Sequence, residues 1–212
     1  SDALPEDYIT VVGNGSACVV GSHAYTIKKG QRFIINSAIA SMGYDLPAAI
    51  GACVADGAKE LVCLTGDGSI QMNLQELQTN KLPIKIFIIN NQGYHSIRQT
   101  QTNFFGEPLV GIGPESHDLE FPSMEKLAYA YDYPYFSCDS NENLEETVHK
   151  ALEMEGSCIC EVFVTTEQKF EPKSATKRLE DGTLVSPPLE DLAPFLPREE
   201  FLSNMLIKPI EE

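Results

Sequence analysis

The chain has 212 residues, of which 42% are hydrophobic and 22% are charged, and this composition is typical of one folded domain with an appendage. Thirty-one acidic residues against fifteen basic ones give a net charge of −16, which disfavours nucleic acids and anionic membranes as partners. A phosphorylated ligand would also be repelled in bulk solution. Its binding would need oriented backbone amides, a metal cation, or both.

No apolar run approaches the roughly 20 residues that a membrane-spanning helix needs. The first eight residues, SDALPEDY, have neither the basic nor the apolar region of a secretory signal. Six cysteines occur in apolar segments without metal-binding spacing, so we expect buried, reduced thiols. These features predict a soluble, cytoplasmic protein.

Short β-branched runs alternate with helical patterns along the chain. This alternation predicts an α/β fold with a doubly wound, mainly parallel six-stranded sheet and helices on both faces. The expected strands are residues 9–12, 32–35, 61–65, 84–90, 135–137 and 158–164. The fourth is almost continuously apolar, as expected of a central strand that is covered on both faces.

Capping residues and apolar spacing predict the helices. Asp45 is expected to cap a helix that has Pro47 in its first turn and ends at Gly57. Apolar periodicity predicts three more helices, one around residues 70–77, one that begins at Ser123 and one around residues 144–152.

Two stretches break this pattern. Residues 92–122 lack clear periodicity and contain several glycines and prolines, which predicts a long loop that is functional or mobile. Residues 1–166 are therefore expected to form the domain. Residues 167–212 hold six of the thirteen prolines together with many apolar residues, and we expect this irregular tail to dock on the domain or on a partner subunit.

The third strand runs directly into Gly66-Asp67-Gly68-Ser69 and the start of a helix. Glycines on both sides of Asp67 allow a tight turn, and the helix start presents free amides to an anion. A carboxylate among anion-binding amides is consistent with a hard cation between two negative groups, and Mg²⁺ with a phosphate fits that description. Taken alone, the motif could equally be only a turn.

The next strand ends in Asn90-Asn91-Gln92-Gly93. If the two strands are neighbours, Asp67 and Asn91 lie at the same carboxyl edge of the sheet, where open α/β sheets bind their ligands. Two such motifs at the ends of consecutive strands are much less easily explained as turns.

G-D-G-S followed about two dozen residues later by N-N resembles the thiamine diphosphate motif. The surrounding sequence, ASMGYDLPAAIG at residues 40–51, GDGSIQMNLQEL at residues 66–77 and EVFV at residues 161–164, resembles the acetolactate (acetohydroxyacid) synthase family. The likeness extends over residues 9–164. It implies the C-terminal, diphosphate-binding domain of a thiamine diphosphate-dependent enzyme.

The resemblance also implies roles for individual residues. Asp67 and Asn91 would bind Mg²⁺ through their side chains, and Gly93 would bind it through its carbonyl. Met42 would support the bent cofactor from below, and Ala40 would hold the aminopyrimidine edge. The full cofactor set implied is Gly15, Ser16, Ala17, Ala40, Met42, Gly66, Asp67, Gly68, Ser69, Asn91, Gly93, Tyr94 and His95.

In this family a glutamate on a separate pyrimidine-binding domain activates the cofactor. The resemblance therefore implies that this chain holds no catalytic residue of its own. It also implies a pyrimidine-binding domain on the same or a partner chain, a homodimer or homotetramer, and a small 2-oxo acid substrate. Acetolactate synthesis from pyruvate, simple decarboxylation and a split-subunit decarboxylase share the same cofactor residues.

Two other classes of protein compete with this interpretation. Gly13-Asn14-Gly15-Ser16-Ala17-Cys18 comes close to the dinucleotide-binding pattern, but Cys18 occupies the place of the third glycine. The second strand then ends in Asn36 instead of an acidic residue, which argues against a Rossmann dehydrogenase. A non-catalytic cofactor-binding or interaction module remains open at this point.

Overall fold

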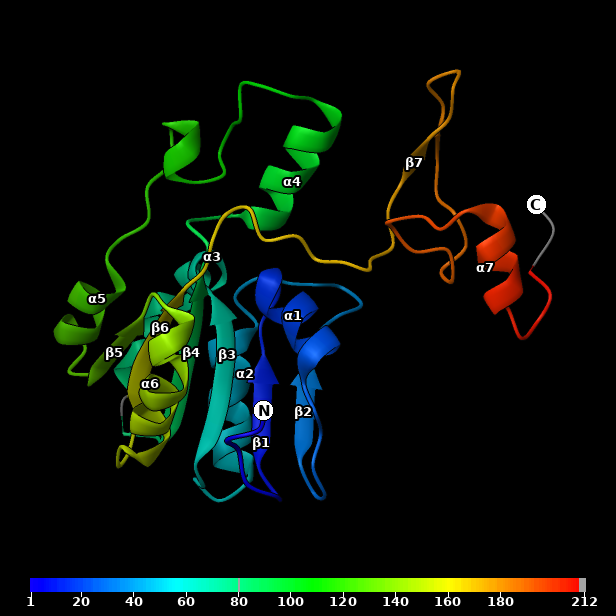
Figure 1. Cartoon of the computed structure of the whole chain (residues 1–212). Coiled ribbons are helices and arrows are strands. Elements are labelled where there is room, and N and C mark those ends of the chain that lie inside the picture. The colour runs from blue at the N-terminus through cyan, green and yellow to red at the C-terminus, as the bar shows by residue number, and fades with distance from the viewer. Residues whose placement is uncertain (80, 210–212) are drawn as a thin grey trace. The chain divides into compact units, whose positions relative to one another are not determined.

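Six parallel strands form the central sheet of the computed structural model, which describes residues 1–79 and 81–209 (Figure 1). Their order is β2-β1-β3-β4-β6-β5. The strands are β1 (Ile9–Val12), β2 (Arg32–Ile35), β3 (Leu61–Gly66), β4 (Ile84–Asn90), β5 (Tyr135–Cys138) and β6 (Cys158–Phe163). The predicted sheet is confirmed, because the β-branched runs in the sequence coincide with these strands.

Helices cover both faces of the sheet, as the sequence predicts (Figure 1). On one face α2 (Asp45–Ala55) and α5 (Met124–Ala130) pack against residues such as Val11 and Ile86. On the other face α6 (Asn141–Glu153) packs against the side of β4 that bears Phe87, and α1 (Ser16–Ala24) lies over β1 and β3. The core therefore has two apolar layers, with the strands between them.

The helix predicted around residues 70–77 is not one regular helix. The structure has a short α3 (Asp67–Ile70) followed by a 3₁₀ segment, η1 (Gln71–Thr79), with non-helical dihedral angles at Asn73. The break has a tertiary cause, because the Asn73 amide donates a hydrogen bond of 2.6 Å to the carbonyl of Gly43. A side-chain bond outside the helix here outweighs local helix propensity.

Asp45 does not cap α2, because the capping position is Tyr44 and Asp45 is the first helical residue. Its carboxylate is completely buried and accepts a short hydrogen bond from the hydroxyl of Thr65 on β3. The predicted helix end at Gly57 agrees with the structure. Gly57 has a φ of +75°, and its amide donates to the Val54 carbonyl.

The predicted long loop at residues 92–122 contains two helical elements, α4 (His95–Phe104) and the 3₁₀ turn η2 (Pro114–Ser116). The buried residues of α4 are polar, His95 and Arg98. Apolar periodicity therefore could not indicate this helix. The helix predicted from Ser123 is confirmed, since the Ser123 hydroxyl accepts a hydrogen bond from the Lys126 amide.

The chain forms two compact units, Ser1–Glu167 and Gln168–Glu212. The second unit contains a two-stranded ribbon of β7 (Lys177–Arg178) and β8 (Leu184–Val185), and a helix, α7 (Arg198–Asn204). A bidentate ion pair joins Arg198 to Asp191 with both contacts at 2.8 Å. Over residues 1–79 and 81–209, no helix is long and apolar enough to cross a membrane.

A fully buried lysine joins several elements at the amino end of the sheet. Lys85, on the central strand β4, donates hydrogen bonds to the carbonyls of Met154 and Gly156, and it lies 3.2 Å from a carboxylate oxygen of Glu60. Glu60 also accepts a hydrogen bond of 2.8 Å from the Tyr8 hydroxyl. A charge at this depth is tolerated only because each of its partners is in place.

We expect Lys85→Met to lower the free energy of unfolding by about 3 kcal/mol, because two carbonyls and a carboxylate lose their common donor. Urea denaturation measures this change. Lys81→Met is the matched control, since Lys81 is exposed, and its change should stay within about 0.5 kcal/mol. Equal changes in the two variants would show that the buried contacts of Lys85 contribute nothing to stability.

Candidate functional site

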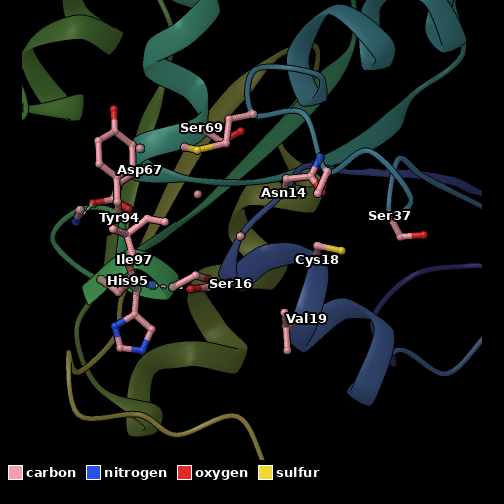
Figure 2. Close-up of a pocket in the computed structure, with 18 residues that line it drawn as sticks. Asn14, Ser16, Cys18, Val19, Ser37, Asp67, Ser69, Tyr94, His95 and Ile97 are labelled. Carbon is pink, nitrogen blue, oxygen red and sulfur yellow. Dashed lines mark hydrogen bonds between the residues drawn. The ribbon is translucent and has the colours of Figure 1, made fainter. Parts of the chain in front are cut away.

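The strand order places one cavity at the carboxyl edge of the sheet. The chain crosses from β1 to β2 on one side of β1, whereas β3 and β4 follow on its other side. This reversal is where open α/β sheets bind ligands. A cavity of about 460 Å³ opens there, between the segments that follow β1, β2, β3 and β4 (Figure 2).

The residues expected from the sequence to hold the cofactor surround this cavity, with one exception. Ala17 does not line it, because its side chain faces the core on α1 and is completely buried. The others line the cavity: Gly15, Ser16, Ala40, Met42, Gly66, Asp67, Gly68, Ser69, Asn91, Gly93, Tyr94 and His95. They come from four separate segments, so the fold brings together residues up to 80 positions apart.

Asp67 begins α3, and its carboxylate is buried. The amide of Gly93 donates a hydrogen bond of 2.7 Å to Asp67 Oδ2, which ties the loop after β3 to the loop after β4. Burial raises the pKa of Asp67 to about 6, although hydrogen bonds from backbone amides, that of Gly93 foremost, act in the opposite direction. The site thus holds one carboxylate in a buried position, where desolvation disfavours its charged form.

Asn91 is buried beside Asp67 on the neighbouring loop. Its amide nitrogen donates a hydrogen bond of 2.6 Å to the Ser16 hydroxyl on α1. Its side-chain oxygen, Oδ1, is buried without a hydrogen-bond partner among the residues that the structure describes. An orphaned buried acceptor is costly unless a ligand completes it.

The loop after β4 is shaped by close backbone contact at Gly93. This residue has a φ of +124°, and a Cβ there would lie 1.9 Å from the carbonyl oxygen of Ile112. The Tyr94 amide donates to the same carbonyl at 2.7 Å. The Tyr94 ring in turn covers the turn after β3, since a Cβ on Gly68 would lie 2.7 Å from it.

The turn that carries Met42 is held by the elements that follow β3. The Gly43 amide donates a hydrogen bond of 2.9 Å to the Ser69 hydroxyl, and the Gly43 carbonyl accepts from Asn73. Met42 therefore extends to the cavity wall from a turn that is fixed on both sides. The Ser69 hydroxyl is used to hold this turn. At the start of α3, Ser69 therefore has its main-chain amide available for a ligand.

Several residues of the site were not found from the sequence. Asn14 lines the cavity, and its side-chain nitrogen donates a hydrogen bond of 2.7 Å to the Ser41 carbonyl. Its side-chain oxygen, Oδ1, is buried without a hydrogen-bond partner in the described part of the chain. The sequence feature that could have indicated Asn14 is its position just after the first predicted strand. Arg98 donates hydrogen bonds to carbonyls of the loop after β4. The only sequence feature that could have indicated it is that it is a basic residue in an acidic chain. Cys18, Val19, Ser37, Ser96 and Ile97 also line the cavity.

The arrangement can hold a hard divalent cation next to a diphosphate. One carboxylate (Asp67), one free amide oxygen (Asn91) and the Gly93 carbonyl make up an all-oxygen donor set, which is what Mg²⁺ prefers. Among residues 1–79 and 81–209 no three His, Cys, Asp or Glu side chains gather into a metal cluster. The first residues of α1 and α3 line the cavity, and main-chain amides at helix starts are groups that bind phosphates.

Comparison with known proteins identifies the class. Residues 13–162 match the family model "Thiamine pyrophosphate enzyme, C-terminal TPP binding domain". The chain belongs to this family, as the resemblance of its motifs predicts. The cavity lined by Asp67 and Asn91 is consistent with the thiamine pyrophosphate that gives this family its name.

Individual relatives are acetolactate synthases. The chain is 37% identical over 153 residues to the acetolactate synthase large subunit of Porphyra purpurea, which covers 69% of this chain and 25% of that protein. It is 33% identical over 190 residues to acetolactate synthase 2, chloroplastic, of Nicotiana tabacum. This match covers 81% of this chain and 29% of that protein. The chain thus spans about a quarter of the length of these relatives.

We expect Gly93→Ala to lower the free energy of unfolding by about 3 kcal/mol or more, because a methyl group would collide with the Ile112 carbonyl in addition to the cost of a positive φ. Gly106→Ala is the matched control. Gly106 also has a positive φ, +75°, but a Cβ there meets nothing within 4 Å, so only the conformational cost of about 1–2 kcal/mol remains. Chemical denaturation of both variants tests this, and equal losses would contradict the close packing of the loop.

Proposed function

We propose that this chain is the diphosphate- and Mg²⁺-binding domain of an enzyme that acts on 2-oxo acids, in the manner of acetolactate synthase. The buried, unpartnered Oδ1 of Asn91 beside the carboxylate of Asp67 carries this proposal. Family membership and the names of the relatives support the choice of cofactor and reaction class. Thiamine diphosphate would supply the electron sink that decarboxylation of a 2-oxo acid requires.

In this proposal the residues of the chain bind and orient the cofactor. Asp67, Asn91 and the Gly93 carbonyl hold the cation, and the amides at the starts of α1 and α3 hold the diphosphate. Ser16 contributes a hydroxyl next to Asn91, where the resemblance places glutamine and histidine in many synthases. Met42 and the Ala40 carbonyl bound the cavity where the ring system of the cofactor would lie.

In this proposal the group that activates the cofactor comes from outside this cavity. Among its described lining residues, Asp67 is the only carboxylate, and the proposed metal occupies it. Two apolar side chains at or next to the lining are exposed: Ile97, which lines the cavity, is 51% exposed, and Ile39, which precedes the lining residue Ala40, is 81% exposed. An apolar rim of this kind supports the proposal that a pyrimidine-binding domain, on the same or a partner chain, covers the site and provides the activating glutamate.

The relatives favour synthase over decarboxylase, because acetolactate synthase is the name they carry. We therefore propose carboligation after decarboxylation of pyruvate, by a homodimer or homotetramer. The six cysteines are all free thiols, which supports the cytoplasm as the compartment. A synthase and a decarboxylase are distinguished by the product that the full-length enzyme forms from pyruvate, acetolactate or acetaldehyde.

We expect Asp67→Ala to weaken the binding of Mg²⁺ and thiamine diphosphate by at least about 100-fold, because a charged ligand is removed and the diphosphate then faces an acidic protein without its counterion. Asn91→Ala should act in the same direction but more mildly, since it removes a neutral ligand. Calorimetry on the full-length enzyme measures both. Asp139→Ala, at an exposed position, is the control, and an Asp67 variant with the affinity of this control would refute the metal assignment.

We expect the 212-residue chain alone, supplied with Mg²⁺ and thiamine diphosphate, to turn over no pyruvate, because its cavity holds no activating carboxylate. Addition of the pyrimidine-binding domain should restore turnover. His95 lines the cavity and is the residue to substitute if the isolated chain proves active, since activity would require a proton relay within this chain.

A further inference from the structure

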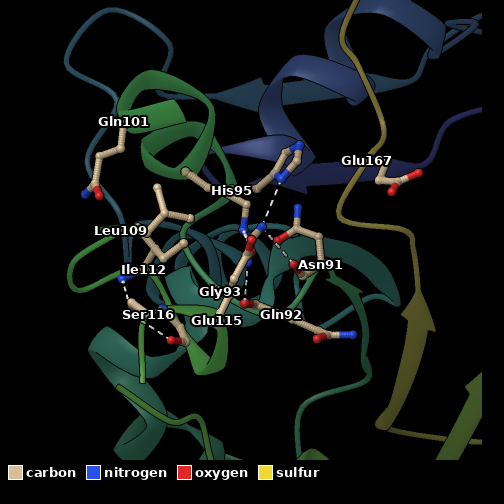
Figure 3. A network of polar contacts seen from close by, with 12 residues as sticks. Asn91, Gln92, Gly93, His95, Gln101, Leu109, Ile112, Glu115, Ser116 and Glu167 are labelled. Atoms are coloured by element: carbon tan, nitrogen blue, oxygen red, sulfur yellow. Dashed lines mark hydrogen bonds and ion pairs between the residues drawn. The ribbon is translucent and has the colours of Figure 1, made fainter. Parts of the chain in front are cut away.

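Arg98 is a buried arginine on α4 that contacts the loop after β4. Figure 3 shows this loop with Asn91, Gln92 and Gly93, and with Glu115 nearby. Its Nη1 donates to the Asn91 carbonyl at 3.2 Å, and its Nη2 donates to the Gln92 carbonyl at 2.8 Å. Nη1 also lies 3.0 Å from Nδ1 of His95. A guanidinium only donates, so this ring nitrogen accepts and a neutral His95 carries its proton on Nε2.

These contacts determine which oxygens of the loop remain for an ion. The carbonyls of Asn91 and Gln92 are held by the guanidinium, whereas the Asn91 side-chain oxygen stays without a partner in the described part of the chain. The side chain of Asn90 adds a second support, because its oxygen accepts from the Gln92 amide at 2.9 Å and its nitrogen donates to Glu161 at 2.6 Å. The loop is therefore fixed on both sides.

Glu115 compensates the charge of Arg98. A carboxylate oxygen of Glu115 lies 2.7 Å from Arg98 Nε. Without it, a buried guanidinium would stand immediately behind a cation site and repel the ion. Glu115 is brought there by a segment that also pairs with α4, since the Gln101 side chain makes two hydrogen bonds of 2.8 Å with the main chain of Val110.

We propose that Arg98 is a positioning residue that shapes the Asn91–Gly93 loop for a small octahedral cation, and that Glu115 keeps this support electrically neutral. The inference rests on the proposed function, because it concerns the ion that the domain would hold. Mg²⁺ requires near-ideal geometry at about 2.1 Å, whereas Ca²⁺ accepts irregular ligands at about 2.3–2.6 Å. A loop that is held rigid therefore favours Mg²⁺, and a loosened loop loses this preference.

The test is calorimetric titration of the full-length enzyme with MgCl₂ and, separately, CaCl₂, at saturating thiamine diphosphate. Arg98→Lys keeps the charge, but a single ammonium group cannot hold both carbonyls and also lie beside the Glu115 carboxylate as the guanidinium does. We expect it to weaken Mg²⁺ about 10-fold and Ca²⁺ much less, so that the preference for Mg²⁺ narrows. A merely structural role would weaken both ions by the same factor, and that result, or no change, overturns the proposal. Arg32→Lys, at an exposed position, is the control.

Glu115→Gln tests the second half of the proposal, independently of the Arg98 variant. The Glu115 side chain is half exposed, so we expect this variant to fold. We expect both ions to bind several-fold more weakly, because the two carry the same charge and face the same uncompensated guanidinium. Glu120→Gln, at an exposed position, is the control. Unchanged affinities for Glu115→Gln overturn this half of the proposal.

The wild-type titration separates the two levels of inference. A wild-type enzyme that binds neither ion in the presence of thiamine diphosphate refutes the proposed function and the role of Arg98 together. A wild-type enzyme that binds Mg²⁺ more tightly than Ca²⁺, with Arg98→Lys unaltered, refutes the role of Arg98 alone.

Discussion

The hydrogen bond from the Gly93 amide to the Asp67 carboxylate joins the two loops on which the candidate site depends. It forms because β3 and β4 are parallel neighbours, with Gly66 opposite Ile89 in the register, so that the chain leaves both strands at the same height. A shift of that register by one residue would move the side chains of one strand to the opposite apolar layer and separate the two loops. The apolar layers on both faces of the sheet therefore determine the geometry of a polar site at its edge.

The strands and the principal motifs were predictable because their signals are local. β-Branched runs and glycines act within a few residues, and the rule for the carboxyl edge of parallel sheets then brings Asp67 and Asn91 together. The same rule explains why the cavity lies where the sequence predicts it. The prediction that Asp67 and Asn91 meet required only that β3 and β4 be neighbours.

The features that were missed have partners far away in the sequence. Asn73 interrupts a helix in order to bond with Gly43, and Asp45 bonds with Thr65 instead of capping its own helix. α4 escaped detection because its buried face carries His95 and Arg98, which no apolar period marks. In each case a tertiary polar contact outweighs the local pattern, and such conflicts concentrate around the cavity.

The chain has a net charge of −16, so a site for an anionic ligand needs a local source of positive charge. Two helix starts, which carry partial positive charge, line the cavity, while the buried guanidinium of Arg98 is paired with Glu115. Main-chain amides carry a fixed partial charge and do not titrate, so they attract an anion at any ordinary pH. The binding of an anionic ligand is thereby separated from the overall charge of the surface, which remains free to be acidic.

The contact between the loop after β4 and the segment around Ile112 is made almost entirely by main-chain atoms: the Tyr94 amide meets the Ile112 carbonyl, and Gly93 lies against Gly113. Mutational tolerance along this segment is consequently uneven. The exposed side chain of Val110 takes no part in its own two hydrogen bonds with Gln101 and can be exchanged freely, whereas neither glycine has room for a methyl group. Divergence can therefore alter the surface chemistry of the segment while the ligands of the proposed metal keep their places.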